Sequence, residues 1–167
     1  MNGYEKDIRL EKKFASKIKQ ILGEVFITQD PILDRQEATD FLIFTVNISK
    51  VAARLRTYKH YTTEDRKNEF TIRYSRPSGN PTEIDKIREG KVGYIFYGFA
   101  NSDETKIIHW FIGDLDVFRK NESPKVRPYP NDPPDSEFVA YKIKQFPKSF
   151  IVARGGKGNQ QALIEVP

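Results

Sequence analysis

The residues best suited to chemistry lie between positions 40 and 56. Asp40 stands directly before an apolar run, "FLIFTV", and two arginines, Arg54 and Arg56, follow on the alternating segment "KVAARLRTY". A carboxylate at one strand end with charged side chains on the next strand is typical of a metal-dependent nuclease, because acids hold Mg²⁺ and cations stabilise the phosphorane. The alternating segment itself carries no second carboxylate. The pattern therefore predicts either a nuclease or a protein that keeps only the framework of one.

Another carboxylate, Glu11, interrupts the apolar face of a helix that the sequence predicts over residues 5–22. At the angular spacing of an α-helix, Glu11 projects near the middle of the apolar arc, between Ile18 and Leu22. A carboxylate directed at a core is costly unless it is paired or bound to a metal. We therefore expect Glu11 to point inward and to pair with Arg54 or another buried cation; exposure near a helix end is the alternative.

The stretch "RLRTYKHYTTEDRK", residues 54–67, interleaves basic and aromatic side chains. Cations can neutralise phosphates, and tyrosine rings can stack on bases. The predicted nucleic-acid-binding residues are Arg54, Arg56, Tyr58, Lys59, His60 and Arg66, with Tyr61 as a second candidate ring. The alternative interpretation is an ordinary solvated hairpin loop.

These residues need elements that position them, and the first half of the chain supplies a helix and three strands. After the helix over 5–22, which Gly23 is expected to end, strands are predicted near 41–47, 50–57 and 69–75. The first is a continuous apolar run and the other two alternate, which favours an antiparallel meander.

The second half predicts a short helix, a hairpin and irregular segments. Thr82 is a candidate N-cap for the helix, a strand near 93–100 pairs with "KIIHWFI", and Asp114 caps another short helix. The segment 121–137 holds five of the ten prolines and is expected to be an exposed loop. Residues 155–167 are expected to form a flexible tail.

Composition limits the protein class. The chain has 167 residues, no cysteine and a net charge of +5 with a pI of about 9.3. This length suits one domain, over residues 1–167, and the absence of cysteine excludes disulfides. No apolar run is long enough to span a membrane, and no signal peptide is recognisable, so the cytoplasm is the expected location. The positive charge favours a polyanionic partner.

The order helix, three-strand meander, helix, strand resembles the core of the PD-(D/E)XK, or restriction-endonuclease-like, fold over about residues 5–112. The resemblance implies an α/β fold with a central mixed sheet flanked by helices. It places Glu11 and Asp40 as catalytic acids and Mg²⁺ ligands, with Arg54 at the position of the catalytic lysine. The match fails at Ala52, which stands where that family has an acid. Glu37 and Glu69 flank core strands, and either could supply the missing acidic ligand from another position in the fold.

The stretch is also similar to uncharacterised phage proteins with an arginine-bearing strand. We therefore expect a nucleic-acid-associated protein of a phage or mobile element, with a degenerate and weak or inactive catalytic centre. One alternative is an active Mg²⁺-dependent nuclease, and a second is an inhibitor that binds a host defence protein, in the host cytoplasm. The partner is nucleic acid, with DNA preferred, or a host protein, and the oligomeric state is left open.

Overall fold

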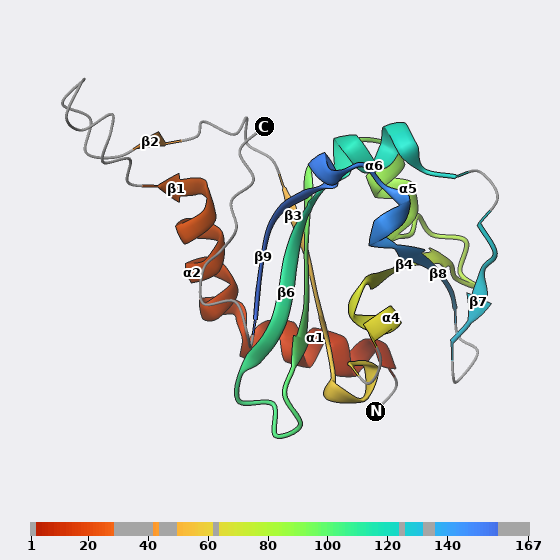
Figure 1. The fold of residues 1–167 in the computed structure, drawn as a ribbon. Coiled ribbons are helices and arrows are strands. Elements are labelled where there is room, and N and C mark those ends of the chain that lie inside the picture. The colour runs from red at the N-terminus through yellow and green to blue at the C-terminus, as the bar shows by residue number, and fades with distance from the viewer. Residues whose placement is uncertain are drawn as a thin grey trace.

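The protein is a mixed α+β fold, as the sequence predicts, with a four-stranded mixed sheet at its centre (Figure 1). The computed structural model describes residues 3–28, 42–43, 50–61, 64–123, 126–131 and 136–156. The central sheet has the order β3-β5-β6-β9, where β3 is Val51–Arg56, β5 is Tyr94–Ala100, β6 is Ile107–Asp114 and β9 is Ile151–Gly156. The β3 and β5 strands are parallel, and the pairs β5–β6 and β6–β9 are antiparallel.

One face of the central sheet is covered by an interrupted helix. The single helix expected over 5–22 is instead α1, Gly3–Lys13, followed by α2, Ala15–Phe26, and Gly23 lies inside α2. Hydrogen bonds continue through the turn at Phe14, whose amide donates to the Leu10 carbonyl at 2.9 Å. The predicted apolar face is confirmed, since it buries Leu10, Phe14, Ile18 and Ile21 against the sheet, and Val25, beyond the expected end of the helix, is buried with them.

The other face of the central sheet packs on a second, three-stranded sheet and two short helices. That sheet has the order β4-β8-β7, with β4 at Glu69–Ser75, β8 at Glu137–Lys142 and β7 at Tyr129–Pro130. The helices are α5, Glu83–Arg88, and α6, Leu115–Asn121. The main core of aromatic and branched side chains lies here, around the fully buried Phe70. The strands β3, β5 and β6 are therefore the middle of three layers.

The antiparallel meander expected from the first three strands is wrong. The strand boundaries near 50–57 and 69–75 are confirmed, but β4 pairs with β8, and β3 pairs with β5 in parallel. The segment between β3 and β5 thus crosses from one layer to another and back. Of the strand expected near 41–47, the structure describes only β2, Leu42–Ile43, which pairs with β1, Ile27–Thr28.

Several local predictions of the second half are confirmed. Thr82 is the N-cap of α5 in a capping box with Asp85, and Asp114 accepts hydrogen bonds from the first-turn amides of α6. The β5–β6 hairpin forms as expected.

Two short 3₁₀ helices connect β8 to β9. The first, η2, Ile143–Gln145, precedes Pro147, and the second, η3, Lys148–Phe150, follows it and leads into β9.

Two irregular segments contain more strand than expected. Within the proline-rich segment, Tyr129 and Pro130 form the exposed edge strand β7. Residues 155 and 156, assigned to the expected tail, belong to β9 and pair with Trp110 and His109 of β6, respectively. Residues 157–167 lie outside the described part of the chain. Among the described helices, none has the length and apolar character needed to cross a membrane.

Candidate nucleic-acid interface

Two of the three expected catalytic residues, Glu11 and Arg54, lie on different sides of the central sheet. Glu11 is half-buried on α1, which packs on the face of β3 that carries Leu55. Arg54 alternates with Leu55 and faces the opposite side. Asp40 lies outside the described residues. The arrangement therefore places Glu11 and Arg54 in separate layers, and the pairing expected between them is replaced by another contact of Arg54.

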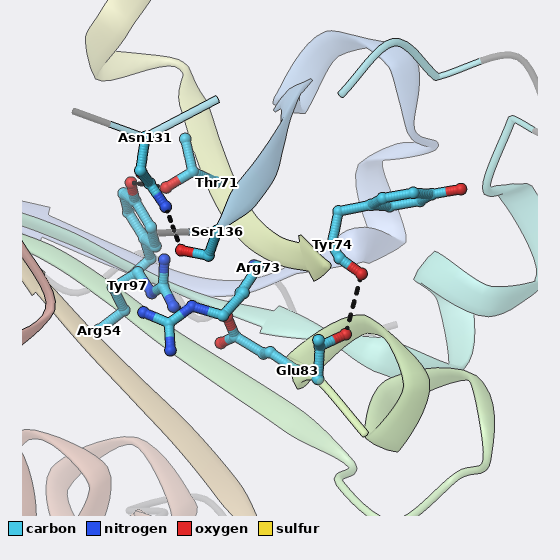
Figure 2. A network of polar contacts seen from close by, with 9 residues as sticks. Arg54, Thr71, Arg73, Tyr74, Glu83, Tyr97, Asn131 and Ser136 are labelled. Atoms are coloured by element: carbon cyan, nitrogen blue, oxygen red, sulfur yellow. Dashed lines mark hydrogen bonds and ion pairs between the residues drawn. The ribbon is translucent and has the colours of Figure 1, made fainter. Parts of the chain in front are cut away.

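That contact is an ion pair with Glu83 of α5 (Figure 2). The Arg54 Nη2 donates to Glu83 Oε2 at 2.6 Å, and the backbone amide of Arg73 donates to the same oxygen at 3.2 Å. Both charged side chains are largely covered, with 14% and 19% of their surfaces exposed. Glu83 thus links the edge strand of the central sheet to β4 of the second sheet.

The acids considered as replacements do not form a metal site in the described part of the chain. No cluster of three His, Asp or Glu side chains is found among the described residues. Glu69 begins β4 in the second sheet, and its Oε1 atom lies 4.0 Å from the Lys142 Nζ atom. Glu37 is outside the described residues. Ala52 lies on the same face as Arg54, packed against the main core.

The basic cluster, which we define as Arg56, Lys59, His60 and Arg66, lies at the carboxyl end of β3. Arg56 is the last residue of that strand, Lys59 and His60 belong to the 3₁₀ helix η1, Tyr58–His60, and Arg66 belongs to α4, Glu64–Lys67. Lys59 and Arg66 are exposed. Five of the six predicted nucleic-acid-binding residues thus lie on one short stretch, and Arg54 is separated from them by its contact with Glu83.

The charges of the basic cluster act together at His60. Burial lowers the pKa of His60, and the neighbouring charges of Arg56, Lys59 and Arg66 lower it further, to about 4. His60 is therefore neutral at pH 7, and three permanent cations surround it. Such a concentration of like charge attracts polyanions, since a bound phosphate relieves the mutual repulsion.

Aromatic rings lie beside these cations. Tyr58 is 47% exposed, and its ring centroid is 6.2 Å from that of Tyr61. Tyr61 in turn packs on Phe99 at 5.4 Å, and the Lys67 ammonium lies 4.8 Å from the centre of the Tyr61 ring. The His109 ring also packs against Tyr61, with the two ring centroids 5.8 Å apart.

Two functional contacts were missed by reasoning on the sequence. Glu83 lies in the first turn of α5, and its pairing with Arg54 depends on a crossing between layers that local sequence patterns do not encode. Lys67 belongs to the same basic stretch as Arg66, and its spacing of six residues from Tyr61 gives no periodic signal of their contact.

Comparison of the chain with protein-family models, with curated proteins and with solved structures finds no match.

Proposed function

We propose that the protein binds nucleic acid through the basic cluster and cleaves it weakly or not at all. The observation that carries the proposal is the convergence of Arg56, Lys59 and Arg66 around His60, whose pKa is lowered to about 4, first by burial and then by these three charges. The net charge of +5 acts in the same direction, because phosphate neutralisation supplies most of the affinity of non-specific nucleic-acid binding.

Weak or absent catalysis is proposed because the expected metal centre lacks a ligand on β3. Ala52 offers no ligand, and Arg54 is engaged by Glu83 on the face opposite α1. Mg²⁺ binds firmly only where several oxygen ligands converge, and an arginine nearby repels the ion.

The proposal is tested by fluorescence anisotropy with a labelled oligonucleotide at low salt. Lys59→Glu reverses a charge inside the basic cluster, whereas Lys148→Glu reverses an exposed charge on η3, which precedes β9 at the opposite end of the sheet (Figure 1). We expect Lys59→Glu to weaken binding and to reduce the slope of log affinity against log salt by about 1. Lys148→Glu should bind like the wild type.

Equal effects of the two substitutions would show that binding depends on net charge and not on the basic cluster. No binding by the wild type at low salt would overturn the proposal and would favour a protein partner for this surface.

A further inference from the structure

Tyr58 presents a large aromatic surface to solvent within the basic cluster. It is one of two large hydrophobic side chains that are strongly exposed in the described part of the chain, and the other, Tyr129, lies on β7. Lys59 follows Tyr58 directly, and Arg56 precedes it by two residues. An exposed ring beside cations matches the two parts of a nucleotide, because the ring can stack on the base and the cations can bind the phosphate.

The ring is supported from below. Tyr61 contacts Tyr58 at a centroid distance of 6.2 Å and contacts the buried Phe99 at 5.4 Å, so the outer ring rests on rings that reach the core. Lys67 holds the Tyr61 face at 4.8 Å. Because Tyr61 is held on both sides, it fixes the surface on which Tyr58 lies.

The backbone beneath the ring is also fixed. In η1 the amide of His60 donates to the Thr57 carbonyl at 3.0 Å, and the amide of Tyr61 donates to the Tyr58 carbonyl at 2.8 Å. A ring on a closed turn loses less conformational freedom on binding than one on an open loop, which favours affinity.

We propose that Tyr58 is a stacking platform for an unpaired base, and that the ligand of the basic cluster is single-stranded nucleic acid. This inference rests on the proposed function and adds the class of ligand to it. In a duplex each base face is already covered by its neighbours, so a surface ring finds only backbone and groove edges. A single strand presents free base faces at the spacing of its phosphates, and stacking on tyrosine tolerates any base.

The test compares a labelled oligothymidylate with a hairpin duplex of equal phosphate number, each binding the wild type, Tyr58→Ala, Tyr58→Phe and Tyr129→Ala. Tyr129 is the matched control, because it is equally exposed, at 47%. We expect the wild type to prefer the single strand, Tyr58→Ala to lose about ten-fold in affinity for it, and Tyr58→Phe to keep most of the affinity. Tyr129→Ala should bind like the wild type. Thermal unfolding of each variant checks that its fold is intact.

Failure of this inference is distinguishable from failure of the proposed function. If Tyr58→Ala binds the single strand as tightly as the wild type while Lys59→Glu binds it weakly, the stacking platform is wrong and the basic cluster stands. If the duplex binds as tightly as the single strand, the assignment of ligand class is wrong. If neither oligonucleotide binds the wild type, both proposals are overturned.

Discussion

At the scale of single residues, Glu83 shows how one carboxylate holds two layers together. Its Oε2 atom accepts from the Arg54 guanidinium and from the Arg73 amide, which belong to different sheets. Because both members of the ion pair are largely covered, loss of the charge leaves a guanidinium poorly solvated.

We therefore predict that Glu83→Gln lowers the free energy of unfolding by about 1–2 kcal/mol. Glu89→Gln is the control, since Glu89 lies at the end of the same helix with a side chain 49% exposed, and it should change stability by less than about 0.5 kcal/mol. Urea unfolding measures both. Equal, small changes would mean that the Arg54–Glu83 contact contributes nothing to stability.

His60 makes stability depend on pH. Its folded pKa of about 4 lies below its ordinary value of 6.5, so the unfolded chain takes up the proton first as the pH falls. Stability from this group is full above pH 6.5 and is lost progressively between 6.5 and 4. The full loss is of order 1–3 kcal/mol for a half-buried imidazole.

The readout is the difference between wild type and His60→Gln in urea unfolding at pH 7 and pH 4.5. We expect the wild type to lose more stability than the variant over this interval, because glutamine does not titrate. Identical losses would show that the pKa of His60 is not lowered in the folded protein.

At the scale of elements, short helices depend on their caps. The α6 helix has only seven residues, and Asp114 Oδ1 accepts from the amides of Asp116 at 2.7 Å and Val117 at 3.1 Å. The helix carries Leu115 and Phe118 into the main core, so fraying of its first turn would loosen that core.

We predict that Asp114→Ala lowers the free energy of unfolding by about 1 kcal/mol, and that Asp114→Asn, which keeps an acceptor oxygen, restores most of it. Thermal or urea unfolding of the two variants checks this. If both variants are equally unstable, the charge of Asp114 and not its cap would be responsible.

Elements were easier to predict than their pairing. The boundaries of β3, β4 and β5, and both capped helices, follow from alternation and from Thr82 and Asp114, which are local signals. The partners of β3 and β4 were mispredicted because adjacent alternating strands favour a hairpin, whereas β4 finds its apolar partner in β8, far along the chain. Apolar periodicity shows that a strand has a buried face but not which strand it joins.

The candidate site also has a part that could be predicted from the sequence and a part that could not. The basic cluster lies within one short stretch of sequence, so its members could be predicted without the fold. Arg54 was grouped with Arg56 because residues two apart share a face of a strand. The two arginines do share that face, but only tertiary structure shows that Glu83 meets the first and η1 follows the second.

At the scale of the whole molecule, the arrangement predicts a protein that binds nucleic acid better than it cuts it. In a plasmid and oligonucleotide assay with Mg²⁺ or Mn²⁺, we expect little or no cleavage by the wild type. Asp40→Ala and Glu11→Ala should behave like the wild type, because Ala52 and Arg54 leave the expected metal centre incomplete. Robust metal-dependent cleavage that Asp40→Ala abolishes would instead establish an active nuclease.

Phosphate binding at the basic cluster can be followed through the pKa of His60 in NMR spectra recorded with and without oligothymidylate. The chain has two histidines, so His60→Gln assigns the signal, and thymine stays unprotonated over this pH range. In the free protein we expect a pKa of about 4 for His60, held down by burial and by Arg56, Lys59 and Arg66. A bound phosphate offsets these cations, so the pKa of His60 should rise on binding, and the affinity should therefore increase as the pH falls toward 4. A saturated complex in which the pKa of His60 is unchanged would place the nucleic acid elsewhere and contradict the account.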